Sequence, residues 1–163
     1  MTTAQLHIRR AGALDSRAIA ALLNEIIAIG GTTAMVDPVT SDQMAKKMAV
    51  DQAVWHLAED EAGTLLGFQY IVPHPDIPKD ATDIATFVRV GQTGLGIGSK
   101  LFAATLAAAK SMGYTRIDAI IRSDNEGGLA YYQSRGFETI KLLKGTKLAN
   151  GQPVDKVWKR YKI

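Results

Sequence analysis

The fold of this chain is decided by residues 88–102, which read Val88-Arg89-Val90-Gly91-Gln92-Thr93-Gly94-Leu95-Gly96-Ile97-Gly98-Ser99-Lys100-Leu101-Phe102. An apolar, β-branched run (84–90) enters a glycine-rich turn, and an alanine- and leucine-rich segment (100–112) leaves it as a predicted helix. Glycine lacks a Cβ and lets the backbone approach a ligand closely. A helix N-terminus adds unpaired N–H groups and the positive end of a dipole. This order of elements therefore predicts an anion site, most often for phosphate.

Two familiar phosphate motifs do not fit this turn. The P-loop requires Gly, four residues and then Gly-Lys-Ser/Thr, whereas Gly98 is followed by Ser99-Lys100. The dinucleotide fingerprint Gly-x-Gly-x-x-Gly fails because its third glycine would fall on Ser99 or Leu101. A plain strand-to-helix connection remains the alternative, although such a connection seldom needs so many glycines.

The composition is that of an ordinary globular protein. The chain has 163 residues, 47% hydrophobic and 21% charged, with a net charge of +3, and we expect one domain over residues 1–163. This weak, dispersed charge does not favour nucleic acid, and the basic residues of 156–162 are expected on the solvent face of a strand. The absence of cysteine and the wide spacing of three histidines predict no metal site. Without a membrane span or signal-peptide pattern, we expect no membrane partner and a cytoplasmic location.

Periodicity and turn residues predict seven strands and four helices. The strands are expected at residues 5–10, 54–59, 65–72, 84–90, 116–121, 137–143 and 154–161, and the helices at 16–27, 41–48, 100–112 and 125–134. Ser41 or Asp42 is expected to open the second helix. The resulting order, β-α-α-β-β-β-α-β-α-β-β, predicts an α/β (α+β) fold with a mixed sheet and helices on both faces.

This order, with a glycine turn after the fourth strand, resembles the GNAT superfamily of acetyl-CoA-dependent N-acetyltransferases. The family turn is Arg/Gln-x-x-Gly-x-Gly/Ala, and residues 93–98 fit it except at Thr93, since Gln92 lies one place early. A second block, 125–137, resembles the family segment Asn-x-x-Ala-x-x-x-Tyr-x-x-x-Gly-Phe, with Gly128 in place of the alanine. The two blocks occur in the family's order, so the resemblance covers nearly the whole chain.

The resemblance implies a site for acetyl-CoA, which serves as co-substrate. In the family the fourth strand separates from the fifth, and the pantetheine arm enters the gap. Here the amides of Val88 and Val90 would hold that arm, and Asn125 would contact it. The backbone N–H groups between Thr93 and Ser99 would hold the pyrophosphate, which gives the residues Thr93, Gly94, Gly96, Ile97, Gly98 and Ser99.

The resemblance also implies catalytic roles. Tyr132 would protonate the departing CoA thiolate, since a phenol with a pKa near 10 can donate a proton as the sulfur gains charge. Its plain alternative is an aromatic residue packed in the core, the role expected for Tyr131. Asp83 is the nearest candidate for the base that deprotonates the amine, with a solvated strand-end carboxylate as its plain alternative. His74 and Glu25 are weaker candidates.

The acceptor is expected to be the primary amine of a small molecule or a peptide, attacking directly in a ternary complex. In the family the loop between the first two helices and the last hairpin shape the acceptor pocket. Thr32 and Thr33 would line it here, with turn residues as the plain alternative. Residues 24–40 resemble phosphinothricin-type acetyltransferases but lack the aromatic residue usually found near Met35. Two alternatives remain: a non-catalytic domain that binds acyl-CoA, and a protein that binds a nucleotide other than CoA. Dimerisation through the last strands is also expected.

Overall fold

The computed structural model describes residues 5–92 and 96–163. In chain order the elements are β1 (His7–Arg10), the 3-10 helix η1 (Ala13–Asp15), α1 (Ser16–Ile29), α2 (Ser41–Met48), β2 (Val54–Glu59), β3 (Leu65–Val72), β4 (Ala81–Val88), α3 (Ile97–Ser111), β5 (Arg116–Arg122), α4 (Glu126–Ser134), β6 (Glu138–Lys147) and β7 (Pro153–Lys162). The predicted order of strands and helices and the mixed α/β class are confirmed.

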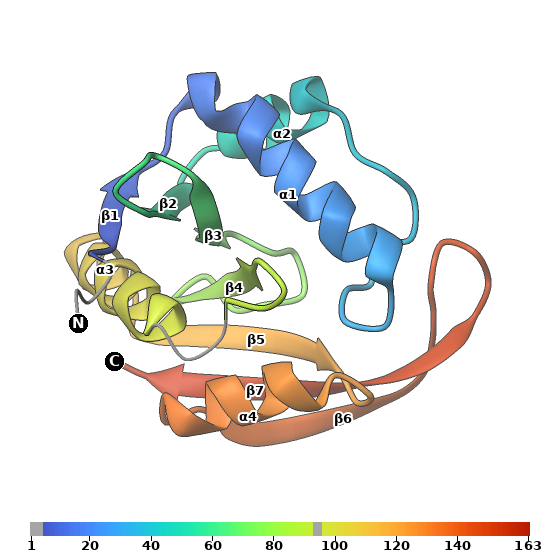
Figure 1. Ribbon diagram of the computed structural model, residues 1–163. Coiled ribbons are helices and arrows are strands. Elements are labelled where there is room, and N and C mark those ends of the chain that lie inside the picture. The colour runs from blue at the N-terminus through green and yellow to red at the C-terminus, as the bar shows by residue number, and fades with distance from the viewer. Residues whose placement is uncertain (1–4, 93–95) are drawn as a thin grey trace.

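One seven-stranded sheet organises the chain, in the order β1-β2-β3-β4-β5-β7-β6. Every neighbouring pair is antiparallel except β4 and β5, which are parallel. These two strands pair only between Ala81–Asp83 and Arg116–Asp118, and over the rest of their lengths they lie apart (Figure 1). The sheet is therefore split beyond Asp83, between its fourth and fifth strands.

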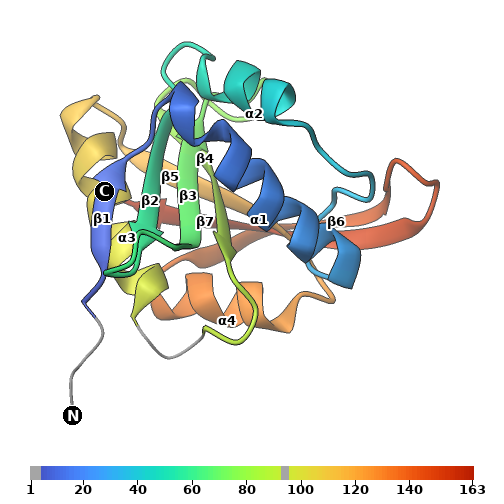
Figure 2. The same ribbon diagram turned by 45° about the horizontal axis from the view of Figure 1, so that its top comes forward.

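The helices cover the two faces of the sheet in pairs (Figures 1 and 2). Helices α1 and α2 bury Ile19, Leu23 and Met44 against an aromatic face of β2 and β3 that includes Trp55 and Phe68. Helices α3 and α4 lie on the opposite face, where the buried cluster consists of Val54, Ile71, Ile84, Phe102, Ala109, Tyr114, Ile117, Ala119, Ile121, Tyr132 and Phe137. Because side chains alternate along a strand, β2, β3 and β4 contribute to both cores.

Several element boundaries differ from the sequence prediction by one to four residues, and those of β4 and α3, with the cap of α2, bear on the site. Strand β4 spans Ala81–Val88 rather than 84–90, because Ala81 and Thr82 already pair with β5 although they are not part of the β-branched run. Helix α3 begins at Ile97 rather than at residue 100, directly after the left-handed Gly96 (φ 73°). Helix α2 is capped by Thr40, not by Ser41 or Asp42. The Thr40 hydroxyl accepts a bond from the N–H of Gln43, whose side chain accepts one from the N–H of Thr40.

The basic residues of β7 do not form a solvent face, so that expectation was wrong. Lys159 is 7% exposed, and its Nζ donates to Thr139 Oγ1 at 3.0 Å. On the other face of the strand, Arg160 pairs with the fully buried Asp118 of β5. The charges were expected outside because they alternate with Val157, Trp158 and Tyr161 along the strand, whereas hydrogen bonds to Thr139 and Asp118 allow Lys159 and Arg160 to lie inside.

Candidate active site

The place where β4 and β5 separate carries two carboxylates side by side. Asp83 of β4 and Asp118 of β5 are register partners in the last pair before the gap. Asp118 is completely buried and accepts three hydrogen bonds, from Trp158 Nε1 at 3.0 Å and from Arg160 at 2.8 and 2.9 Å. The two bonds from Arg160 are charge-assisted and hold the carboxylate in place. Asp118 therefore places a fixed negative charge beside Asp83.

Asp83 is the predicted base, and its surroundings disfavour its charged form. Burial and the charge of Asp118 raise the pKa of Asp83 from its usual value near 4 to about 7, against the opposing effect of Lys156. Tyr70 of β3 also lies near, and burial, together with the charge of Asp83, raises the pKa of its phenol. A carboxylate with a pKa close to neutral is suited to accept a proton at physiological pH.

Removing Arg160 tests how much the Asp118 pair contributes to stability. We expect Arg160→Leu to lower the free energy of unfolding by about 3 kcal/mol, because Asp118 would stay buried with only the Trp158 bond. The exposed pair of Arg116 and Asp80 supplies the control, and Arg116→Leu should cost less than about 1 kcal/mol. Urea unfolding measures both, and equal losses would contradict this account of the buried pair.

Tyr132 lies on the opposite side of the sheet from Asp83. It is the buried tyrosine of α4, and its hydroxyl is 2.8 Å from Thr86 Oγ1. Burial raises the pKa of Tyr132 and the Thr86 hydrogen bond lowers it, with burial the stronger effect. Asp83 and Thr86 are three residues apart on β4, so their side chains point to opposite faces. The two predicted catalytic groups thus lie on either side of β4, next to the gap.

The N-terminus of α3 borders the gap and has the features of an anion site. Gly96 precedes it in the left-handed conformation, and no acidic residue occupies its first turn. A Cβ on Gly98 would lie 2.5 Å from a ring carbon of Tyr131, so only glycine fits there. Ile97 is buried, while Ser99 Oγ accepts a hydrogen bond from Arg135 at 2.7 Å. The predicted residues Thr93 and Gly94 lie outside the described residues.

The α1–α2 loop is fastened to the start of α4. Asn125 caps α4 by accepting from the N–H of Gly128 at 3.0 Å, and its Nδ2 donates to the carbonyl of Thr32 at 3.0 Å. The guanidinium of Arg122 donates to the carbonyl of Thr33, also at 3.0 Å. A Cβ on Gly128 would lie 2.5 Å from Asn125 Nδ2, so an alanine at this position would require the Asn125 side chain to shift. The backbone carbonyls of Thr32 and Thr33, the predicted acceptor residues, thus hold the loop close to Asn125.

The remaining predicted site residues do not contact Asn125, Thr32 or Thr33 through a hydrogen bond of the described residues. Val88 ends β4 and packs near Ile97, whereas Val90 lies beyond the strand and is 63% exposed. Glu25 forms an ion pair with Arg89 at 2.7 Å. His74 accepts a bond from the N–H of Asp76 through Nδ1 and lines a separate pocket with Gln52 and Tyr114.

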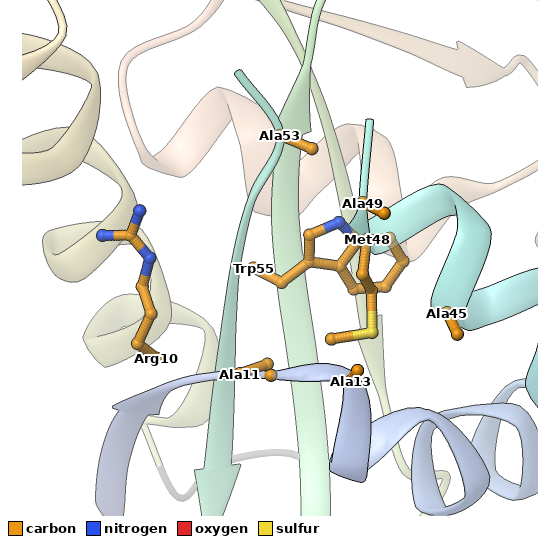
Figure 3. Close-up of a pocket in the computed structure, with 9 residues that line it drawn as sticks. Arg10, Ala11, Ala13, Ala45, Met48, Ala49, Ala53 and Trp55 are labelled. Atoms are coloured by element: carbon orange, nitrogen blue, oxygen red, sulfur yellow. The ribbon is translucent and has the colours of Figure 1, made fainter. Parts of the chain in front are cut away.

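A further cavity of about 220 Å³ lies between η1, α2 and β2 (Figure 3). It is lined by Arg10, Ala11, Gly12, Ala13, Ala45, Met48, Ala49, Ala53 and Trp55, none of which was predicted to act in catalysis or binding. Within residues 5–92 and 96–163, no cluster of three or more histidine, aspartate or glutamate side chains is positioned to hold a metal ion. The helices of the same residues are all too short or too polar to cross a membrane.

Three residues at the site were not predicted from the sequence. Gln69 of β3 and Thr86 of β4 are hydrogen-bonded to each other beside Tyr132, and Asp118 adjoins Asp83. A signal was present for two of them, because Gln69 and Asp118 are single polar residues inside otherwise apolar strand segments. Buried polar residues of this kind need partners and often mark function.

Comparison with known families identifies the chain. Residues 21–137 match the model of the acetyltransferase (GNAT) family. The chain belongs to the GNAT family. Two curated relatives, L-methionine sulfoximine/L-methionine sulfone acetyltransferases from Pseudomonas aeruginosa and Pseudomonas paraeruginosa, are each 28% identical over 138 residues, covering 80% of this chain and 79% of theirs. The enzyme is an acetyl-CoA-dependent N-acetyltransferase, and the non-catalytic alternative is not favoured.

Solved structures share the fold of this acetyltransferase. An N-acetyltransferase from Staphylococcus aureus has a TM-score of 0.86 and 23% identity, with 97% of this chain and 98% of that chain covered. A phosphinothricin acetyltransferase from Sinorhizobium meliloti, crystallised with acetyl-CoA, has the same TM-score and identity over 99% of this chain and 89% of that chain. The resemblance to the family is confirmed, and the fold is shared with a phosphinothricin-type acetyltransferase.

Proposed function

We propose that the enzyme transfers the acetyl group of acetyl-CoA to the primary amine of a small, amino-acid-like molecule, by direct attack in a ternary complex. The observation that carries the proposal is the split between β4 and β5, with Tyr132 on one side of β4 and Asp83 on the other. The attacking nitrogen and the departing sulfur are bonded to the same carbon in the transition state. The groups that serve them must therefore approach from different directions, and the two sides of the split sheet allow this.

The donor would lie along the open edge of β4 and against the N-terminus of α3. The N–H of Arg89 is bonded to Leu66 of β3 at 2.8 Å, so the alternation of a strand directs the N–H of Val88 toward the gap. That amide, with Val90 beyond it, would hold the pantetheine arm as an added strand. The amides of Ile97, Gly98 and Ser99 would bind the pyrophosphate, together with Thr93, Gly94 and Gly96. Asn125 keeps one amide hydrogen for the pantetheine.

Substitution of Gly96 tests this donor site. We expect Gly96→Val to weaken CoA binding at least about 10-fold, because the side chain would occupy the space where the pyrophosphate approaches and would strain a left-handed residue. No described residue lies within 4 Å of a Cβ at Gly96, so internal clashes do not explain such a loss. Isothermal titration with CoA measures the affinity. Gly63→Val is the matched control, since Gly63 has φ 80° and equally open surroundings in a distant turn; similar losses in both variants would rule out the assigned site.

The chemical step needs two proton transfers and no further reagent. The amine nitrogen attacks the thioester carbon, so a C–N bond forms and the C–S bond breaks. Asp83 accepts the proton that the amine loses, directly or through water, and Tyr132 gives its proton to the departing sulfur. Alignment of the two reactants supplies much of the remaining rate enhancement.

The acceptor would lie under the α1–α2 loop, near Thr32 and Thr33. Both ribbon views place this loop beside the tip of the β6–β7 hairpin (Figures 1 and 2). The curated relatives act on L-methionine sulfoximine and L-methionine sulfone, which are amino acids, and this favours a small amino-acid-like acceptor over a peptide.

An amine panel tests the acceptor class. Release of the CoA thiol should be fastest with free amino acids and their sulfone or sulfoximine analogues, and slower with peptides that present the same residue at the N-terminus. Faster turnover of the peptides would contradict the small-molecule acceptor. CoA binding without turnover of any amine would instead favour the non-catalytic alternative.

We also infer a cytoplasmic homodimer that pairs through the last strands. Strand β6 forms one edge of the sheet, and its Ile140 and Leu142 are 45% and 60% exposed, which supports association of this edge with a second copy. Light scattering of the purified protein should give twice the mass of one chain, and the Leu142→Lys variant should give the mass of one chain. A monomer at micromolar concentration would contradict the inference.

A further inference from the structure

A chain of hydrogen bonds connects the first turn of α3 to Tyr132. The hydroxyl of Tyr131 donates to the carbonyl of Gly98 at 2.8 Å. The Nε2 of Gln69 lies 3.0 Å from that hydroxyl and 2.9 Å from Thr86 Oγ1. Thr86 Oγ1 in turn lies 2.8 Å from the hydroxyl of Tyr132. This series of hydrogen bonds therefore runs from α3 to α4, then to β3 and β4, and returns to α4 at Tyr132.

The direction of every bond in this series except the last follows from its first acceptor. A carbonyl oxygen can only accept, so Tyr131 gives its single hydrogen to Gly98. The oxygen of Tyr131 must then accept from Gln69, which fixes the side-chain amide with its nitrogen toward the two hydroxyls. The second amide hydrogen goes to Thr86 Oγ1. Thr86 is left with one hydrogen of its own, and the Tyr132 oxygen is in position to receive it.

We propose that Thr86 donates its hydrogen bond to Tyr132, so that the hydrogen of the Tyr132 hydroxyl is free to be given to the sulfur of the departing CoA. Gln69 and Tyr131 are positioning residues that set this direction. In the opposite arrangement the Tyr132 hydroxyl would donate its hydrogen bond to Thr86, and its proton would not point toward the thiolate. Thr86 also continues to donate after the transfer, when Tyr132 carries the negative charge. This inference rests on the proposed role of Tyr132 as the acid.

The burial of Gln69 supports a role in function rather than in stability. Its side chain is fully buried within an apolar strand, and its Oε1 lacks a hydrogen-bond partner among the described residues. An unsatisfied buried oxygen is unfavourable, and an apolar residue of similar size would avoid that cost. The two N–H groups of Gln69, by contrast, are both used to orient hydroxyls of the site.

The competing view is that Thr86 only packs against Tyr132 and holds its ring. Thr86→Val keeps the shape and removes the hydroxyl, while Thr86→Ser keeps the hydroxyl and removes a methyl group. If Thr86 acts through the proton of Tyr132, its effect must vanish once that proton is absent, as in Tyr132→Phe. A packing effect would persist in both backgrounds.

The experiment is a double-mutant cycle in steady-state kinetics, with thermal unfolding to confirm that each variant folds. We expect Thr86→Val to lower kcat about 10-fold with KM for acetyl-CoA within about twofold of wild type, and Thr86→Ser to retain most of the rate. In the Tyr132→Phe background, Thr86→Val should change kcat less than about twofold. Equal losses in both backgrounds, or no loss in the wild type, would overturn this inference and leave the role of Tyr132 intact. An unchanged kcat in Tyr132→Phe alone would overturn the proposed acid itself.

The Gln69→Leu variant gives an independent test of the direction of the chain. Without the amide, the hydroxyls of Thr86 and Tyr131 lose the donor that orients them, so kcat should fall by about the same factor as in Thr86→Val. The combination of Gln69→Leu with Thr86→Val should be no slower than either single variant, since both act on one hydrogen. If the kcat of the double variant fell by the product of the two single losses, the two residues would act independently, which would contradict a common action through Tyr132.

Discussion

Tyr132→Phe should lower kcat at least about 100-fold while leaving KM for acetyl-CoA nearly unchanged. The substitution keeps the ring in its packing with Phe137 and Tyr131 but removes the hydrogen that we assign to the departing sulfur. Binding of the donor precedes proton transfer, and we assign it to backbone amides that the substitution does not touch, so the loss should appear in kcat. Steady-state rates of thiol release, measured at saturating amine, give both constants.

A matched tyrosine outside the site provides the control for this prediction. Tyr114 is also buried, and its hydroxyl donates to Gln52 at 3.1 Å in a separate part of the structure. Tyr114→Phe should change stability slightly and kcat less than about twofold. If both variants lost activity equally, the effect of Tyr132→Phe would be one of folding. If Tyr132→Phe raised KM without changing kcat, the hydroxyl would serve donor binding and another group would protonate the thiolate.

The sequence predicted those features that depend on short spacing. Asn125, Tyr132 and Gly136 fall on one helix and its end, so their spacing could be read without knowledge of the fold. The glycine turn likewise indicated an anion site by its composition. Gly96 does precede α3 with a positive φ, and Gly98 lies where a side chain would strike Tyr131. Such local patterns specify the backbone directly.

The sequence did not predict contacts between distant strands. Thr86 and Tyr132 are 46 residues apart, and Asn125 and Thr32 are 93 apart. Their meeting depends on the sheet order and on the register of β4 against β3, neither of which periodicity determines. The expectation that Tyr131 belongs to the core was incomplete for the same reason. Its ring does pack beside buried residues, but its hydroxyl joins α3 to β3.

The split of the sheet was expected from the family resemblance alone. Nothing in residues 81–88 or 116–122 taken separately indicates that the strands pair at one end and part at the other. The neighbouring aspartates offer a physical reason for the position of the split. Asp83 and Asp118 form the last pair, and two carboxylates on adjacent strands disfavour close pairing beyond them unless one is neutral. The neighbouring charge that disfavours further pairing also contributes, with burial, to the raised pKa of Asp83.

Asp83→Asn should lower kcat/KM about 100-fold at pH 8 and should abolish the acid limb of the pH profile. The pKa of Asp83 is raised to about 7 by burial and by the charge of Asp118, and Lys156 reduces the effect only in part. Below pH 7 the carboxyl is protonated and cannot accept a proton, so the wild-type rate should fall as the pH falls through that value. The variant has no such group, and its residual rate should not follow this limb. Rates from pH 5 to 9 measure both profiles.

The same substitution should affect stability in the opposite direction, which separates a catalytic loss from a folding defect. A raised pKa means that the folded state binds the proton of Asp83 more tightly than the unfolded chain does. Its contribution to stability is therefore present at low pH and is lost as the pH rises through about 7. Asp83→Asn avoids placing a second charge beside Asp118, so the variant should be more stable than the wild type at pH 8 and about equally stable at pH 4. Asp76→Asn, at an exposed aspartate, should change neither activity nor stability measurably. If Asp83→Asn instead kept the acid limb near pH 7, the proton of the amine would leave by another route, and Asp83 would act only in ending the pairing of β4 with β5.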